Sequence, residues 1–177
     1  MDTSQNIEES TANVFIQQLR SSTTTTATNA SRSLGMLGIK ATKAVPALVM
    51  ASKHKNAELR AQACASLGRI VSNPMLAIPA LAIALNDVNQ DVRRYAAAAI
   101  VEYGSESSII IEQLINALTD ADEYVREFVI TAIENLENNS EVILHSIKQC
   151  EADSNFYVRC AAKRIIRKYA TFKSVAA

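Results

Sequence analysis

Tryptophan is absent from this sequence of 177 residues, and aromatic residues make up only 5% of it. Glycine occurs 4 times and proline 3 times, which is too little punctuation for the many turns of a β-sandwich or barrel. The hydrophobic residues, 49% of the chain, are mainly Ala, Ile and Leu. Small side chains and good helix formers suit closely packed helices. The composition therefore predicts a single all-α domain with a continuous core.

Net charge is also lacking, because 18 Lys and Arg balance 18 Asp and Glu. The balance removes long-range attraction to nucleic acid or to an anionic membrane, so neither is an expected partner. The charges are nevertheless unevenly placed. Residues 1–77 carry 8 basic and 4 acidic side chains, residues 78–140 carry 3 and 11, and residues 141–177 carry 7 and 3. An acidic middle therefore lies between two basic ends.

Cysteine is scarce, and Cys64, Cys150 and Cys160 form no CxxC pair. An odd number of scattered cysteines indicates reduced thiols rather than a disulfide framework. No apolar stretch approaches the roughly 20 residues that span a bilayer, and the polar, acidic N-terminus does not fit a secretory signal. We therefore expect a cytoplasmic protein.

Motifs for chemistry are missing as well. His54 and His145 are the only histidines, and no HExxH motif or repeated His–Glu pair surrounds them. Two isolated histidines and scattered cysteines do not supply a metal site. The sequence also has no GxSxG motif and no glycine-rich phosphate loop. We expect no metal, no cofactor and no catalytic residue, which favours a protein without enzymatic activity.

What the sequence does have is a repeat of 33 residues. Arg60, Arg93, Arg126 and Arg159 follow one another at this step. Apolar positions keep the same step: Leu48, Leu81, Leu114 and Ile147; Ala63, Ala96, Val129 and Ala162; Leu67, Ile100, Ile133 and Ile166. One further step back come Ala12, Phe15, Ala30 and Leu34, which indicates a degenerate first repeat.

Each unit has the period of a helical hairpin. One helical face is apolar at Val92, Ala96, Ala99, Ile100 and Tyr103, and residues 78–85 have a similar face. A short polar turn, residues 86–90, separates the two. Each unit thus reads as helix A, turn, helix B, with Pro46 and Pro79 near the expected start of helix A. The prediction is an α–α superhelix (α-solenoid) of about five repeats in residues 11–170, with a flexible segment at 1–10 and a tail at 171–177.

The segments Ala44–Leu48, Ala77–Leu81, Leu85–Asp87 and Asp91–Arg93 resemble HEAT repeats, in particular the short HEAT-like repeats of phycobilisome lyases. The resemblance implies an α-solenoid, a fold found in scaffolds, adaptors and a few enzymes. Repeats 4 and 5 have Glu112 and His145 in place of the proline. Repeat 1 has Ala27 in place of the arginine and the run Ser21 to Thr26 as its turn, which we expect to be elongated.

The resemblance also implies a structural ladder between the repeated arginines and the aspartates of the turns. Its members are Asp87, Arg93, Asp120, Arg126, Asp153 and Arg159. Each arginine would reach a carboxylate of its own turn or of the adjacent one through a bidentate bond. The alternative is a row of arginines that binds phosphate. The structural role is favoured because the carboxylates repeat with the same period as the arginines.

The side of the B helices opposite the buried face is the candidate partner-binding surface. Its members in repeats 3 to 5 are Arg94, Tyr95, Ala98, Val101, Glu102, Glu127, Phe128, Thr131, Glu134, Asn135, Arg164, Arg167 and Lys168. The small residues Ala61, Ala65 and Gly68 continue it in repeat 2. This surface changes from small and apolar, through aromatic and acidic, to basic. Such variation favours a binding site, and random surface drift between repeats is the alternative.

The favoured function is a scaffold or adaptor that holds a protein partner on a concave B-helix face. The acidic residues favour a partner with a basic or polar surface. The alternative, which rests on the resemblance alone, is a phycobilin lyase-like protein or subunit, and only then would a bilin be a ligand. A designed repeat without a partner is disfavoured by the irregular first repeat.

Overall fold

The computed structural model describes the backbone of residues 3–136 and 140–175 and the side chains of residues 10–136 and 140–170. Within these ranges every regular element is a helix, which confirms the all-α prediction. The A helices are α1 (Thr3–Gln18), α3 (Val45–Ala51), α5 (Pro74–Ala84), α7 (Ile111–Ala117) and α9 (Glu141–Gln149). The B helices are α2 (Thr24–Leu37), α4 (Ala57–Ile70), α6 (Gln90–Glu102), α8 (Glu123–Asn135) and α10 (Phe156–Val175). Three 3₁₀ helices, η1 (Gly38–Ala44), η2 (Gly104–Ile110) and η3 (Cys150–Ala152), adjoin α3, α7 and α9.

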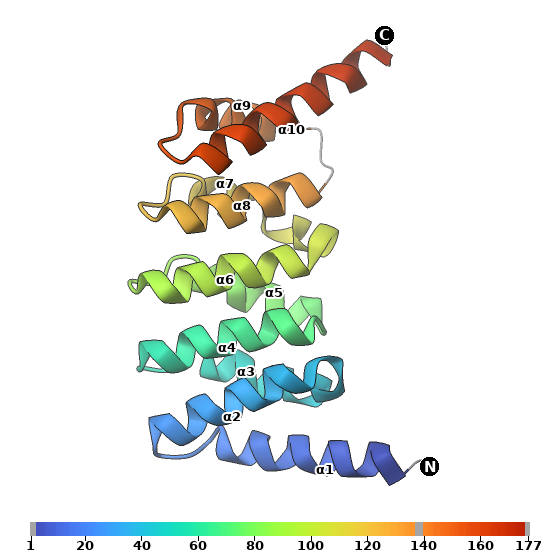
Figure 1. Cartoon of the computed structure of the whole chain (residues 1–177), viewed down its shortest axis with the longest axis vertical. Helices are drawn as coiled ribbons and strands as arrows, with labels where there is room; N and C mark the ends of the chain where they lie inside the picture. The colour runs from blue at the N-terminus through green and yellow to red at the C-terminus, as the bar shows by residue number, and fades with distance from the viewer. Residues whose placement is uncertain (1–2, 137–139, 176–177) are drawn as a thin grey trace.

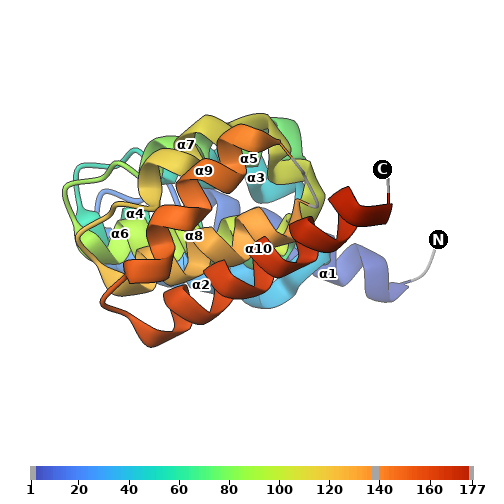
Figure 2. The same cartoon turned by 90° about the horizontal axis from the view of Figure 1, so that it is seen from above.

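The hairpins stack in chain order, so that the N- and C-terminal helices lie at opposite ends of the molecule (Figure 1). Seen along the stack, the B helices form one layer, and α3, α5, α7 and α9 form the other (Figure 2). The first helix, α1, departs from the A layer and lies under α2 at the foot of the stack (Figure 1). This architecture is the α-solenoid that the repeat of 33 residues predicts.

The start of each B helix from α4 onward is set by a capping side chain that also repeats every 33 residues. The N-cap residues are Asn56, Asn89, Asp122 and Asn155. Asn89 shows the geometry, because its Oδ1 accepts hydrogen bonds from the backbone N–H groups of Asp91 (3.0 Å) and Val92 (3.2 Å). The cap satisfies donors that have no partner inside the helix and ends the turn at the same position in each repeat.

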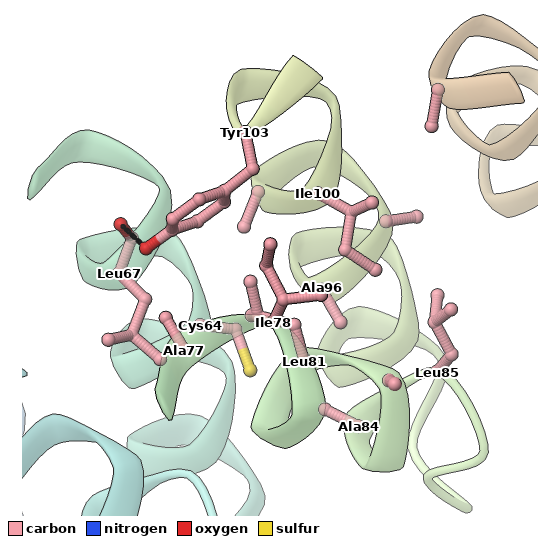
Figure 3. Packing of buried hydrophobic residues seen from close by; sticks show 14 of the residues in the cluster. Cys64, Leu67, Ala77, Ile78, Leu81, Ala84, Leu85, Ala96, Ile100 and Tyr103 are labelled. Atoms are coloured by element: carbon pink, nitrogen blue, oxygen red, sulfur yellow. Dashed lines mark hydrogen bonds between the residues drawn. The ribbon is translucent and has the colours of Figure 1, made fainter. Parts of the chain in front are cut away.

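The core fills the space between the two helix layers. Leu67, Ile78, Leu81 and Ile100 are fully buried there, and Figure 3 shows them with the ring of Tyr103. The Tyr103 hydroxyl donates to the carbonyl oxygen of Leu67 at 3.1 Å, and burial raises the pKa of this phenol to about 12. The hydrogen bond allows the one large polar side chain of this cluster to be buried without an unsatisfied donor.

Successive B helices approach closely through small residues. A Cβ atom placed on Gly68 of α4 would lie 2.7 Å from the Cα atom of Ala99 in α6. One repeat earlier, a Cβ atom on Gly35 would lie 2.8 Å from Oγ of Ser66. Ser66 in turn donates to the carbonyl oxygen of Ser31 at 2.7 Å. The B layer is therefore locked by backbone-to-side-chain contact in the first three repeats.

Some boundaries differ from the sequence-based predictions. Helix α1 already begins at Thr3 and α10 continues to Val175, so helical structure extends beyond 11–170 at both ends. The flexibility expected for residues 1–10 stays a prediction, and residues 1–2 and 176–177 lie outside the described residues. Pro79 was expected near a helix start, but it lies inside α5 because that helix begins at Pro74, directly after left-handed Asn73.

The run from Ser21 to Thr26 is only partly a turn, which corrects the expected elongated first turn. Helix α2 begins at Thr24, after an extended Thr23. The Ser21 hydroxyl accepts a hydrogen bond from the Thr23 N–H at 3.3 Å, which closes the turn before the run ends. Local hydroxyl-to-backbone bonds of this kind favour turns, and they leave the last three threonines of the run free to enter the helix.

One helical stretch of the described chain, Thr24–Ala51, is long and apolar enough to cross a membrane by length and composition. Its most apolar window has a mean hydropathy of 1.4, and 39% of that window is buried within the fold. The sequence-based expectation was that no such stretch exists. The stretch joins α2, η1 and α3 and is interrupted by Gly38, where φ is 57°. Because buried core helices meet the same criterion, this is weak evidence for a membrane span.

Candidate functional site

The repeated arginines bind the aspartate in the turn of the following repeat. The bonds are bidentate, with Nε and Nη2 donating to the two carboxylate oxygens. They join Arg60 to Asp87 (2.7 and 2.7 Å), Arg93 to Asp120 (2.8 and 3.1 Å) and Arg126 to Asp153 (2.8 and 2.8 Å). The sequence left open whether the bond stays within a repeat, and the structure shows that it connects adjacent repeats.

Each of these guanidinium groups also binds its own turn. Nη1 of Arg93 donates to the carbonyl oxygen of Asp87 at 2.9 Å, and Nη1 of Arg126 donates to that of Asp120 at 2.8 Å. The aspartate is held as well, since Oδ1 of Asp87 accepts from the Asn89 N–H at 2.9 Å. One arginine therefore ties two consecutive turns together, and the fork geometry of the guanidinium makes this possible.

The ladder begins at Arg60 because its first rung is missing on both sides. Repeat 1 has Ala27 at the arginine position, and repeat 2 has His54 at the aspartate position. Nδ1 of His54 accepts from the Asn56 N–H at 3.1 Å, which replaces the turn-closing role of the aspartate but not its charge. His54 is thus a turn residue and not a metal ligand.

The guanidinium groups lower the pKa of the carboxyl groups that they bind. The pKa of Asp87 is held below its usual value first by the hydrogen bonds from Arg60, and that of Asp153 likewise by those from Arg126. Burial opposes both shifts. Because a charged hydrogen bond favours the ionised carboxylate, these rungs are ion pairs near neutral pH.

The predicted partner-binding residues divide into two groups by exposure. Six of them are exposed: Tyr95, Glu102, Asn135, Arg164, Arg167 and Lys168. Seven are only partly exposed: Arg94, Ala98, Val101, Glu127, Phe128, Thr131 and Glu134. Ala61 and Gly68 are buried. The expectation that all of these positions point to solvent is wrong, because the close contact between B helices covers the flank of each helix.

Two ion pairs on this surface also join adjacent repeats. The guanidinium of Arg94 binds the carboxylate of Asp122 (Nε–Oδ2 2.8 Å) and lies 4.8 Å from the ring centroid of Tyr124. Arg164 binds Glu134 through Nε at 2.6 Å and also through Nη2. The predicted division into a separate acidic and a separate basic patch is therefore wrong for Glu134 and Arg164, whose charges compensate each other.

Tyr95 is the most distinctive residue of the B-helix face. Its side chain is 50% exposed and borders two hollows between α4 and α6. One hollow, of about 440 Å³, is lined by Arg32, Ala57, Glu58, Ala61, Gln62, Asn89, Asp91 and Tyr95. The other, of about 420 Å³, is lined by Ala65, Gly68, Arg69, Val71, Tyr95, Ala98, Ala99 and Glu102. An exposed aromatic ring between hollows with small, flat floors is a suitable anchor for a protein partner.

Sequence reasoning brought Tyr95, Ala98 and Glu102 to this place but missed the other sides of the hollows. Glu58 and Asp91 were overlooked because they precede the turns of the apolar period and carry no repeat signal of their own. The second of the aromatic pair, Phe128, packs against the core cluster, so the alternative of helix packing holds for it. Tyr95 and Phe128 therefore do not form a common exposed pair.

The thiols and histidines do not assemble a reactive site. Cys64 and Cys150 are buried, and burial raises the pKa of the Cys64 thiol to about 12. Cys160 is exposed, and all three are free thiols. In the described ranges, no group of three or more His, Cys, Asp or Glu side chains could hold a metal ion.

The stacked hairpins and their inter-repeat bonds define an α-solenoid. The family model for HEAT repeats matches residues 12–100 and 78–167, and the chain belongs to this family. No curated protein sequence matches it significantly. Such repeat solenoids are typical of protein-binding scaffolds.

Solved structures share the fold at low sequence identity. An engineered protein of the Northeast Structural Genomics Consortium superimposes with a TM-score of 0.74 at 18% identity, over 90% of this chain and 79% of that chain. A designed armadillo repeat protein in complex with the peptide (KR)4 has a TM-score of 0.73 at 16% identity, over 88% and 80%. The complex of CpcE and CpcF of phycocyanin lyase from Nostoc sp. PCC7120 has a TM-score of 0.72 at 21% identity, over 90% and 65%.

Proposed function

We propose that this chain is a non-enzymatic scaffold that holds a protein partner on its B-helix face, with Tyr95 as the central anchor. The observation that carries the proposal is the position of Tyr95, half exposed between two hollows whose lining comes mainly from α4 and α6. Aromatic residues of this kind contribute much of the binding free energy in protein interfaces. The cytoplasmic localisation expected from the free thiols belongs to the same proposal.

The partner has a basic or amide-rich surface. Both hollows contain exposed carboxylates, Glu58 and Asp91 in one and Glu102 in the other. Residues 78–140 carry 11 acidic and 3 basic side chains, so the surrounding field is negative. The similarly folded designed armadillo protein is in complex with a basic peptide, (KR)4, which supports this chemistry. Such electrostatic complementarity mainly sets specificity and the association rate.

The test compares Tyr95→Ala with Tyr157→Ala, a matched variant of an exposed tyrosine that borders neither hollow. Proteins retained by the immobilised chain from native lysate are quantified by mass spectrometry for wild type and both variants. We expect a partner that Tyr157→Ala retains and Tyr95→Ala loses by at least tenfold, or about 1.4 kcal/mol. If every retained protein is retained equally by Tyr95→Ala, the hollows are not the binding site.

A phycobilin lyase-like function is the second candidate, favoured by the fold shared with the CpcE and CpcF complex. The direct test is absorbance after mixing the chain with a bilin and an apo-phycobiliprotein. A new chromophore band that needs the chain would establish this function. No change in the spectrum, with partner capture dependent on Tyr95, would leave the scaffold as the function.

A further inference from the structure

Arg159 occupies the ladder position of repeat 5 and has the same local geometry as the arginines of the interior rungs. Its Nη1 donates to the carbonyl oxygens of Asp153 (2.7 Å) and Ser154 (2.8 Å), as interior Nη1 atoms do in their own turns. In the three rungs that precede it, Nε and Nη2 hold an aspartate. Within the described part of the chain, no acceptor bonds these two atoms of Arg159. A bidentate carboxylate site is therefore oriented and open.

The face of α10 around this site is basic where the interior helices are apolar. Lys163 takes the position of Cys64, Ala97 and Ile130, which are all fully buried. The same position in repeat 1, Ser31, bonds Ser66 of the following repeat, so this side of a B helix faces the next unit. Lys163 is exposed and lies four residues from Arg159, hence on the same side of α10.

Arg167 continues this row by a further four residues and is also exposed. An apolar repeat cannot cover Lys163 without burying its ammonium group, which is costly when unpaired. A carboxylate-rich surface would instead pair with it. The row of Arg159, Lys163 and Arg167 therefore selects for negative charge in whatever contacts it.

We propose that this face of α10, the open rung, binds an acidic segment of a partner protein and that an aspartate of the segment occupies the fork of Arg159. The partner adds to the stack as a further turn would, with its remaining carboxylates next to Lys163 and Arg167. The pre-oriented guanidinium lowers the entropic cost of forming the bond. This surface lies on α10 and is separate from the hollows at Tyr95 between α4 and α6.

A second copy of the chain does not fit as the occupant. Its first turn would present Ser21 at the aspartate position, and a hydroxyl does not supply a charged bidentate acceptor. Its ladder aspartates Asp87, Asp120 and Asp153 are already bound by their own arginines. The occupant is therefore a different chain that carries an unpaired acidic turn.

The probe is a fluorescein-labelled peptide with the sequence of residues 117–127, the acidic turn whose Asp120 binds Arg93 in the fold. Binding to the whole protein is followed by fluorescence anisotropy. We expect Arg159→Gln and the peptide variant Asp120→Asn each to weaken binding at least tenfold. Arg159→Lys should weaken it less, since the charge remains while the fork is lost.

Lys163→Glu keeps the turn contacts of Arg159 and serves as the second variant if Arg159→Gln melts at a lower temperature. It should also weaken binding at least tenfold, whereas the exposed control Lys53→Gln should bind as wild type does. Equal binding by wild type and Lys163→Glu, or no binding at about 1 mM protein, overturns the proposal. Loss in Tyr95→Ala alone would place the peptide in the hollows and leave the proposed function standing. Dimers in sedimentation that Arg159→Gln abolishes would make a second copy the occupant and overturn the choice of partner.

Discussion

Gly68 of α4 and Ala99 of α6 are in such close contact that a Cβ atom on Gly68 would lie 2.7 Å from the Cα atom of Ala99. A glycine inside a helix ordinarily costs stability of about 1 kcal/mol relative to alanine. Here that cost is accepted at a point where two helix backbones touch. The contact explains why the flank of the B helices that faces the next repeat is covered.

Gly68→Ala is therefore expected to destabilise the fold by about 1–3 kcal/mol, although the change favours helix formation in general. The obstacle is backbone rather than a flexible side chain, so the helices must separate. Urea denaturation measures the change. Gly104→Ala is the comparison, because nothing lies within 4 Å of its added Cβ atom and only the strain of a φ of 53° remains. A stabilised Gly68→Ala protein would contradict the close contact.

Arg126→Ala should destabilise the fold by about 1.5–3 kcal/mol, the value of a lost charged hydrogen bond in a partly buried site. Partner binding should persist, since the rung lies in the turns and not beside Tyr95. A double-mutant cycle with Asp153→Asn should show strong coupling, and Arg126→Lys should recover only part of the loss. An unchanged melting temperature with abolished binding would make the arginine row a functional site instead.

Stability should fall in acid because of the ladder carboxylates. The pKa of Asp153 is lowered in the folded state, so the folded protein binds fewer protons than the unfolded chain and the stabilisation is complete only above the ordinary carboxyl pKa of about 4. It is lost as the pH falls through the lowered value. Asp153→Asn should therefore be much less stable than wild type at about pH 7 and closer to it at about pH 3. Denaturation at both pH values tests this, with the exposed Glu112→Gln as control. A difference that does not change with pH would contradict the ion pair.

Leu81→Ala should cost about 2–5 kcal/mol, because this fully buried side chain in the central repeat leaves a cavity. Phe15→Ala should cost less, since Phe15 is only partly buried and its helix, α1, lies at the end of the stack (Figure 1). Calorimetry of both variants provides the comparison. An equal or larger loss at Phe15 would contradict a weak first repeat.

Glu102→Lys should weaken capture of the Tyr95-dependent partner at least tenfold. The pair Glu127→Lys with Glu134→Lys was the variant suggested by the sequence, but reversing Glu134 also breaks its bond to Arg164. Glu102 borders a hollow directly and is exposed, so its charge can be changed with less effect on the fold. Asn135→Lys, an exposed change on α8, controls for added positive charge. Equal capture by both variants and wild type would exclude an acidic binding field.

The repeat could be predicted because burial recurs with it: every position of the Leu81 row that the structure describes as buried keeps an apolar residue after 33 steps. The direction of each ladder bond could not, since Arg93 is 6 residues from Asp87 and 27 from Asp120 and both distances are compatible with the period. Only the stacking geometry decides which carboxylate is within reach. Exposure was overestimated for Val101 and Thr131 for a related reason, because a single-helix projection contains no neighbouring helix.

The Tyr95 site shows the same limit. Its own period identified Tyr95 and Glu102 as outward-facing, but the residues that complete the hollows come from α4, one repeat earlier. Glu58 and Arg69 have no feature in the sequence that connects them with Tyr95. Sites formed between repeats depend on the inter-helix distance, which here is set by Gly68 and becomes visible only in three dimensions.

The rungs from Arg60 to Asp153 all point from one repeat to the next, and this gives the stack a polarity. Detaching repeat 1 breaks no rung, because Ala27 and His54 together omit it. Detaching repeat 5 opens the fork of Arg126 and deprives α8 of its neighbour. The two ends of the molecule should therefore open unequally, with hydrogen exchange fastest at the N-terminal hairpin and slower across the three bonded turns.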